Sequence, residues 1–155
     1  GIIARINRLA AMVRDGSGQV IFIQHHGVAG EDFAPGAAGW PLLPELDRQD
    51  GDLVLAKTLN DSFAGTDLKA RLDQIAPRRV LIAGWATDFC VDATVRSAVA
   101  HGYHVVPVAD GHTVSDRPHL AAPDVIRHHN WVWSGLIAKG SVRVATTAEL
   151  LAEGA

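Results

Sequence analysis

The stretch RVLIAGWATDFCVDATVRSAVAHGYHVVPVAD, residues 79–110, decides the fold of this 155-residue chain. Its first part, RVLIAG at 79–84, is an almost continuous apolar run, typical of a strand that is covered on both faces. The part at 90–102 has apolar residues at helical spacing and ends on a glycine, which suits the end of a helix. HVVPVAD at 104–110 predicts a further strand. A strand, a helix and a strand in this order predict two parallel strands joined by a crossover helix.

The same alternation continues toward both ends of the chain. The hydrophobic pattern predicts helices at 1–14, 67–75, 123–138 and 147–151, and strands at 19–24, 53–56 and 141–146. Thr146 and Glu149 have the spacing of a capping box at the start of the last helix. We therefore expect a single α/β domain over residues 1–155, with three layers (α-β-α) built around a mostly parallel sheet.

The composition limits the class of protein. Nearly half of the residues are apolar and a fifth are charged, as in an ordinary globular domain. The net charge of −3 argues against nucleic acid and anionic membranes as partners, since both favour a basic surface. No apolar run approaches the ~18 residues of a membrane span. Cys90 is the only cysteine, so no internal disulfide can form, and we expect a cytoplasmic location.

Several chemically active residues end or follow predicted strands. In parallel sheets, ligands bind at the carboxyl ends of the strands, which all lie at one edge. Those that end a predicted strand are His25, His26, Lys57 and Asp110, and those that follow one are Ala86 and Cys90. We expect all of them to face the same edge of the sheet.

Cys90 is the candidate nucleophile. If Thr87 is the N-cap of the following helix, Cys90 falls near its third position. The unpaired N–H groups and the positive dipole there favour a thiolate and can hold an oxyanion. Lys57 would add a cation beside the sulfur. The alternatives are that Cys90 is a small buried apolar residue and that Lys57 is a solvated residue at the end of a strand.

Aromatic residues near these strand ends are candidates for a substrate pocket. A long loop after residue 25 is rich in glycine and proline, and loops of this length in compact domains are usually functional. Trp40 in this loop, Phe63 and Trp85 are expected to shape the pocket, and His26 to line it. Phe63 could instead anchor its loop in the core.

The histidines do not form a metal-binding pattern. His25 and His26 are adjacent, so on a strand they point to opposite faces and rarely bind one ion. His128 and His129 are also adjacent, so on a helix their side chains point in different directions and rarely bind one ion. The sequence contains no HxH or HExxH pattern. We expect neither a bound metal nor another cofactor.

Three segments together resemble one known family. GWATDFCVDATVRSAVAHGYHVVPVADGHT (84–113), VIFIQHHG (20–27) and KTLNDSFAGTDL (57–68) are similar, in matching order, to the isochorismatase-like cysteine hydrolases. The resemblance covers nearly all of residues 1–150. It implies a six-stranded parallel sheet and an Asp–Lys–Cys triad that hydrolyses C–N bonds of small amides, ureides or carbamoyl compounds.

The resemblance also implies roles for individual residues. By position, Cys90 matches the nucleophile and Lys57 the lysine of the triad. The Trp85–Ala86 peptide bond matches a cis non-proline bond of the family, and the N–H groups of Ala86 and Cys90 match its oxyanion hole.

Two features depart from the family pattern. The aspartate of the triad lies on a first strand, before the first helix, whereas this chain begins at that helix. Asp61 and Asp88 look like loop and helix-start residues and do not replace it. We expect the first strand in ~10–20 further residues at the N-terminus. The zinc-binding nicotinamidase branch has Asp-x-His where this chain has Gln24-His25-His26, so the metal-independent branch is favoured.

Three other functions stay open. One is a vinyl-ether hydrolase of the isochorismatase type, which protonates carbon and does not require the thiol of Cys90. Another is a non-catalytic binding protein on the same fold, because the aspartate is missing. The third is a thiol redox protein, although there is no second cysteine to resolve a sulfenate.

The segment HHNWVWSGLIAKG, residues 128–140, predicts self-association. Trp131 and Trp133 are two positions apart, about 200° around a helix, so one ring should lie on a second surface. Exposed aromatic residues often mark partner contacts, and we expect a homo-oligomer, a dimer or larger, with two-fold symmetry. Alternatively, the helix ends near Trp131 and Trp133 folds back over the core.

Overall fold

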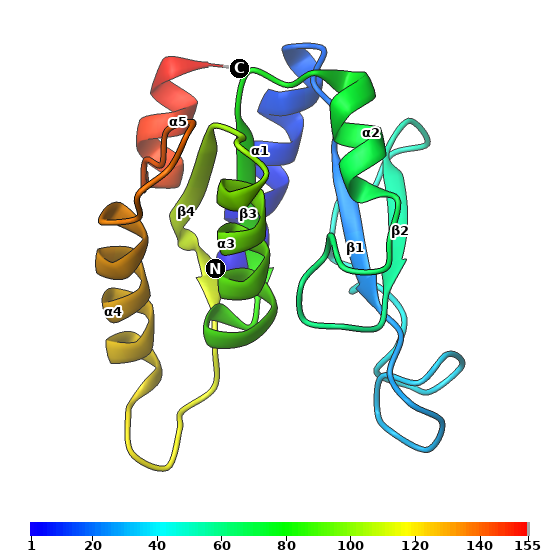
Figure 1. Cartoon of the computed structure of the whole chain (residues 1–155). Helices are drawn as coiled ribbons and strands as arrows, with labels where there is room; N and C mark the ends of the chain where they lie inside the picture. Colours follow the sequence, from blue (N-terminus) through cyan, green and yellow to red (C-terminus); the bar gives the residue numbers. More distant parts are fainter. Residues whose placement is uncertain (155) are drawn as a thin grey trace.

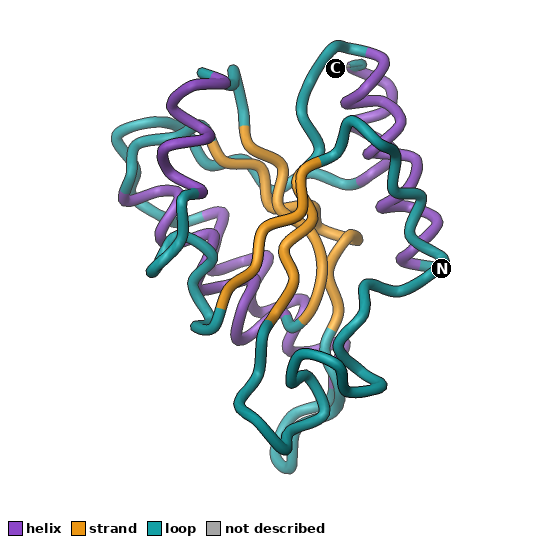
Figure 2. The backbone as a smooth tube through the Cα atoms, turned by 90° about the vertical axis from the view of Figure 1, so that its right-hand side faces the viewer, coloured by secondary structure: helices purple, strands orange, loops and turns teal. Residues whose placement is uncertain are grey.

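The computed structural model describes residues 1–154 and has helices on both sides of a layer of strands (Figures 1 and 2). This is the expected three-layer α/β architecture. The elements in chain order are α1 (Ile2–Asp15), β1 (Ile21–His25), β2 (Leu53–Lys57), α2 (Leu68–Ile75), β3 (Val80–Trp85), the π-helical turn η1 (Thr87–Val91), α3 (Asp92–Ala100), β4 (Val105–Thr113), α4 (Ala122–Ser134) and α5 (Thr147–Glu153).

The strands form two separate parallel pairs. β1 pairs with β2, from Ile21 opposite Leu53 to His25 opposite Lys57. β3 pairs with β4, with an irregularity after Ile82. Within residues 1–154, no strand pairing joins the two pairs, and β1 and β3 are the inner strands on either side of the division (Figure 1). The parallel direction agrees with the sequence analysis, but the strands are fewer than the six that the resemblance implies.

The prediction of a regular strand at 141–146 is wrong. This segment runs beside β4 but makes only two isolated parallel bridges, Val105 with Val142 and Val108 with Ala145. Pro107 lies between them in β4 and has no N–H to donate, so a continuous ladder cannot form there.

Asp110 does not lie at the expected edge. β4 continues to Thr113, so Asp110 lies within the strand rather than at its end. Its carboxylate accepts hydrogen bonds from the Thr147 backbone N–H at 2.7 Å and from the Thr147 hydroxyl at 2.8 Å. Asp110 therefore holds the start of α5, and its predicted place among the rim residues is wrong.

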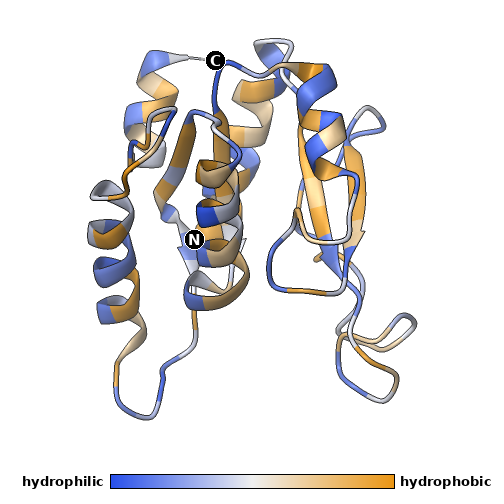
Figure 3. Cartoon of the chain, in the orientation of Figure 1, coloured by the Kyte–Doolittle hydropathy of each residue, from blue (hydrophilic) through white to orange (hydrophobic). Residues whose placement is uncertain are grey.

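Two apolar clusters hold the layers together, one on each face of the strands. The larger cluster joins β2, α2, β3, α3, β4 and α4 and includes Leu55, Leu72, Ile82, Val95, Val105 and Trp133. The smaller cluster packs α1 and α5 against β3 and β4 through Leu9, Val106, Val108 and Leu150. Figure 3 shows that apolar residues predominate along the strands. Neighbouring residues such as Val105 and Val106 belong to different clusters because side chains alternate across a strand.

The helix ends bear on two predictions. Thr146 and Glu149 form the predicted capping box, with both reciprocal hydrogen bonds present. α4 ends at Ser134, four residues earlier than predicted. Its two tryptophans point in different directions, as expected: Trp133 is fully buried, whereas Trp131 is 74% exposed.

No helix in the described part of the chain is both long and apolar enough to cross a bilayer.

Candidate active site

Cys90 and Lys57 meet at the carboxyl ends of the strands. The Lys57 ammonium donates to Cys90 Sγ at 3.2 Å and to the Leu59 carbonyl at 2.7 Å. Lys57 is only 5% exposed, whereas Cys90 is partly accessible. The thiol in turn is 3.7 Å from the Asn60 side-chain oxygen. The sulfur is therefore partly open to solvent and in direct contact with a buried cation.

The turn that carries Cys90 differs from the predicted helix start. β3 ends at Trp85, the Trp85–Ala86 bond is cis as expected, and residues 87–91 form a single π-helical turn before α3. Its hydrogen bonding includes the Val91 N–H to the Ala86 carbonyl at 3.1 Å. Cys90 thus lies within this turn and not at the third position of an α-helix.

Thr87 is not the helix cap that the sequence predicts, because its hydroxyl is used elsewhere. It is fully buried and bonds to His112 Nδ1 at 2.8 Å. His112 Nε2 lies 3.0 Å from the Asn130 side-chain oxygen, and the Asn130 amide nitrogen donates to the Ala109 carbonyl at 3.0 Å. Because Asn130 presents its oxygen, His112 Nε2 must carry the ring proton and Nδ1 must accept from Thr87. This chain of hydrogen bonds ties the turn to β4 and α4.

Burial lowers the pKa of His112, and this effect exceeds that of the hydrogen bond to Asn130, which favours the charged form. The imidazole is therefore neutral at neutral pH, in agreement with the proton assignment.

Asp88 is not a free carboxylate. Both of its oxygens bind the Arg117 guanidinium, at 2.6 and 2.7 Å, and this contact lowers the pKa of Asp88. Arg117 also lies over the ring of Phe89, 5.0 Å from its centre. The bidentate pair fastens the loop after β4 to the Cys90 turn, and it leaves Asp88 unsuited to accept a proton from the thiol.

An aromatic row borders the site on the side of β1. The ring of His25 lies 6.4 Å from Phe33, and Phe33 lies 5.9 Å from Trp85. Phe33 is 40% exposed and Trp85 54% exposed. Gly27 lets the loop return to the strand end, because a side chain there would meet the Phe33 backbone at 3.1 Å. Trp85 was predicted to line the pocket and Phe33 was not, although an aromatic residue in the long loop was a signal that could have identified Phe33.

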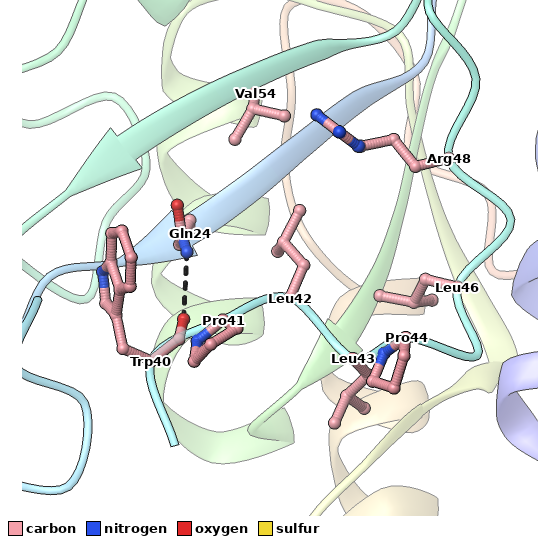
Figure 4. A pocket seen from close by; sticks show the side chains of 9 residues that line it. All are labelled: Gln24, Trp40, Pro41, Leu42, Leu43, Pro44, Leu46, Arg48 and Val54. Carbon is pink, nitrogen blue, oxygen red and sulfur yellow. Dashed lines mark hydrogen bonds between the residues drawn. The ribbon is translucent and has the colours of Figure 1, made fainter. Parts of the chain in front are cut away.

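His26 and Trp40 lie away from this row. Their rings pack against each other with centres 5.4 Å apart, and the Trp40 carbonyl accepts from the Gln24 side chain. Trp40 also lines a cavity of about 440 Å³ with Pro41, Leu42, Leu43, Pro44, Leu46, Arg48 and Val54 (Figure 4). Gln24 and Val54 lie on the face of β1 and β2 opposite to Leu55 and Lys57, because side chains alternate along a strand.

Phe63 lies in the core. It is 8% exposed and packs against His101 and Tyr103. The environment of Phe63 therefore fits the alternative that the sequence left open, an anchor of its loop in the core, better than the predicted place in the pocket wall.

No carboxylate forms an ion pair with Lys57 in the part of the chain that the structure describes. Asp61, the nearest acidic residue in sequence, accepts from the Phe63 N–H instead. Residues 1–154 also contain no group of three or more His, Cys, Asp and Glu side chains that could hold a metal ion.

Comparison with known proteins identifies the family. The isochorismatase domain matches residues 1–134, which is most of the chain. The chain belongs to the isochorismatase family. A crystal structure of another isochorismatase family protein is 30% identical and superposes with a TM-score of 0.83, covering 94% of this chain and 83% of that protein. The α/β fold and the family assignment thus agree.

Among the relatives with named activities are a streptothricin hydrolase and an amidohydrolase. Streptothricin hydrolase from Streptomyces noursei is 34% identical over 124 residues, which cover 80% of this chain and 44% of the hydrolase. The ureidoacrylate amidohydrolase RutB of Variovorax paradoxus is 32% identical over 83 residues, covering 54% of this chain and 33% of RutB. The chain spans about half the length, or less, of these curated relatives.

Proposed function

We propose that this protein is a metal-independent cysteine hydrolase that cleaves a C–N bond of a small molecule through a thioester on Cys90. The observation that carries the proposal is the contact of 3.2 Å between a buried lysine ammonium and a partly accessible thiol. A buried charge is stable only when it is paired, and a thiolate at Cys90 would pair with Lys57. The same pairing would make the sulfur a nucleophile.

The proposed reaction has two steps. The thiolate attacks the carbonyl carbon, forming a C–S bond, and the N–H groups of Ala86 and Cys90 hold the oxyanion. The C–N bond then breaks, and the amine leaves with a proton from a general acid. In the second step, water attacks the thioester and releases the acid product and the free thiol. Both steps need a group that takes up and returns a proton.

A carboxylate on a strand between β1 and β3 is the proposed source of that proton. The inner edges of β1 and β3 pair with no described strand, and the pair of Lys57 and Cys90 connects the two halves at the carboxyl ends. A strand placed there would satisfy both edges and end beside the sulfur. This is consistent with the expectation of a first strand that carries the aspartate of the triad.

The names of the relatives support the reaction class and not a particular substrate. One relative is named for the hydrolysis of streptothricin and one as an amidohydrolase of ureidoacrylate. We infer a compact amide, ureide or carbamoyl compound as substrate. A reducing compartment such as the cytoplasm would keep Cys90 as the free thiol that this chemistry needs.

A panel of small amides, ureides and carbamoyl compounds tests the proposal. The protein is incubated with each compound after treatment with a metal chelator, and ammonia or amine release is measured. We expect release with at least one compound, none in Cys90→Ala, and an acyl group on Cys90 in intact-mass spectra after rapid quenching. Equal release by Cys90→Ala, or loss of activity with the chelator, would contradict the mechanism.

The alternatives predict different results. A vinyl-ether hydrolase would act on isochorismate in both the wild-type protein and Cys90→Ala. A binding protein would hydrolyse nothing in the panel. A thiol redox protein would consume peroxide rapidly.

A further inference from the structure

The N–H group of Cys90 lacks the backbone acceptor that a regular helix start would give it. In an α-helix, the Ala86 carbonyl would accept from Cys90, four positions later. In the structure, this carbonyl accepts from the N–H groups of Phe89 and Val91, both at 3.1 Å, and within residues 1–154 no hydrogen bond joins it to the Cys90 N–H. The π-helical turn therefore passes over the N–H of the candidate nucleophile.

The hydroxyl of Thr87 would be a second acceptor for this group. A threonine at an N-cap accepts from the N–H two or three positions later, which here belongs to Phe89 or Cys90. In the described part of the chain, the Thr87 hydroxyl makes one hydrogen bond, to His112 Nδ1 at 2.8 Å. Because Nδ1 carries no proton, the hydroxyl donates to it. The hydroxyl is thus directed to β4 and away from Cys90.

His112 is itself fixed by contacts on its other side. The ring is almost fully buried, its Nε2 lies 3.0 Å from the Asn130 oxygen, and it packs edge-on against Trp133 with ring centres 4.9 Å apart. The position of this ring therefore determines where the Thr87 hydroxyl lies. Buried hydroxyls are nearly always paired. Without His112, the cap that the sequence pattern favours is the alternative for Thr87.

We propose that His112 is a positioning residue that keeps the Cys90 N–H free for an oxyanion by holding the Thr87 hydroxyl away from it. The proposal rests on the hydrolase function above, in which this N–H stabilises the charge that develops on the carbonyl oxygen. An N–H that already donates to a hydroxyl is lost to that charge. Removal of His112 should therefore slow attack on a carbonyl and leave other reactions of the sulfur unchanged.

Two reagents separate these reactions. With p-nitrophenyl acetate, the thiolate attacks the carbonyl: a C–S bond forms, the C–O bond breaks, p-nitrophenolate leaves, and negative charge develops on the carbonyl oxygen. With iodoacetamide, the thiolate attacks a saturated carbon, iodide leaves, and no oxyanion develops. Mass spectrometry follows both modifications of Cys90, with Cys90→Ala as the background. His112→Leu should be acylated about tenfold to a hundredfold more slowly than the wild-type protein and alkylated at the same rate.

A second substitution distinguishes positioning from general damage to the fold. Thr87→Val keeps the shape of the side chain and removes the hydroxyl, so adding it to His112→Leu should restore most of the acylation rate. Thr94→Val removes another buried hydroxyl, which bonds to Ser62 at 2.9 Å. It is the matched control and should restore nothing in the same background. A merely structural role of His112 predicts that either added substitution lowers the rate further.

Hydrogen exchange of backbone amides, followed by NMR, tests the proposal without relying on the folding of a variant. In the wild-type protein, the Cys90 amide should exchange faster than that of Val91, whose N–H bonds to Ala86. In folded His112→Leu, exchange at Cys90 should become slower, and Thr87→Val should reverse this change.

Four results would overturn the proposal. These are a wild-type Cys90 amide as slow to exchange as that of Val91, unchanged acylation in folded His112→Leu, equal loss of acylation and alkylation, or no recovery with Thr87→Val. Turnover of amides and ureides by the wild-type protein is scored separately. Turnover together with any of these results retains the hydrolase and rejects the role of His112. A wild-type Cys90 that is alkylated but not acylated rejects the hydrolase, and amide exchange then decides whether His112 keeps the Cys90 N–H free.

Discussion

At the scale of single residues, Lys57 is a charged side chain that is almost fully buried. An ammonium that is 5% exposed loses most of its hydration, and the described chain offers it one carbonyl and one sulfur. An uncompensated buried charge costs several kcal/mol. A nearby anion would therefore stabilise Lys57, and Cys90 Sγ at 3.2 Å is in contact with its ammonium.

Replacement of Lys57 by methionine tests this coupling. The variant keeps the length of the side chain and removes the charge, so the rate at which iodoacetamide alkylates Cys90 at pH 7 should fall about tenfold. The rate is followed by mass spectrometry. Lys69→Met, which breaks an exposed ion pair with Asp73, is the control and should react like the wild-type protein. An unchanged rate in Lys57→Met would show that the lysine does not activate the thiol.

His112 gives a prediction about pH. Because its pKa is lowered in the folded protein, the unfolded chain takes up a proton first as the pH falls below about 6.5, and the free energy of unfolding decreases. His112→Gln should cost about 1–3 kcal/mol at pH 7.5, where the wild-type ring is neutral in both states, through lost hydrogen bonds. The difference between variant and wild type should shrink toward pH 5.5.

Urea denaturation at both pH values measures this difference. His128→Gln, on an exposed surface, serves as the comparison. His25 also has a lowered pKa, so some pH dependence will remain in the variant. A constant difference between His112→Gln and wild type would contradict the assignment of a neutral His112.

At the scale of elements, the start of α5 depends on few residues. α5 has seven residues, which is too short to be stable by its own backbone hydrogen bonds. The capping box satisfies the first N–H groups, and Asp110 adds two further hydrogen bonds to Thr147.

Thr146→Ala should therefore lower the free energy of unfolding by about 1 kcal/mol, the usual contribution of such a cap. Chemical denaturation measures the effect, with Thr58→Ala at an exposed loop position as the control. A change no larger than that of the control would mean that packing of Leu150 alone defines this helix.

At the scale of the whole molecule, the most exposed apolar residues lie at the end of α4. Trp131 is 74% exposed and Ile137 98% exposed. A cavity of about 400 Å³ beside Ile137 is lined by Val99, Ala100 and Leu136 among others. Exposed apolar residues are typical of association surfaces, and a two-fold contact is the commonest form in homo-oligomers.

We expect light scattering at micromolar concentration to give a mass of at least twice the 16.5 kDa of one chain. Ile137→Glu should shift the mass toward a single chain, because it places a charge in the contact. Val28→Asp, at a loop residue that is 70% exposed, should not. A mass of one chain for the wild-type protein would end the proposal of self-association.

The sequence predicted the parts of the structure that depend on local pattern. The α/β class follows from the hydrophobic period, the capping box from the spacing of Thr146 and Glu149, and the meeting of Cys90 with Lys57 from strand ends that share an edge. Thr87 was misassigned because its partner, His112, is 25 positions away and reaches it only through the tertiary fold. Phe33 was missed because no periodic pattern describes a loop that folds back on itself.

The separation of the two strand pairs has a consequence for cooperativity. No backbone–backbone hydrogen bond in residues 1–154 joins β1 and β2 to β3 and β4, so within these residues the two pairs of strands are coupled through side-chain contacts. As long as no further strand pairs with the inner edges of β1 and β3, either half can open locally at a free energy below that of global unfolding. Lys57 belongs to one half and Cys90 to the other, so each such opening takes the site apart. A molecule that bridges the two would bind only the closed form, and its binding would merge two separate unfolding events into one.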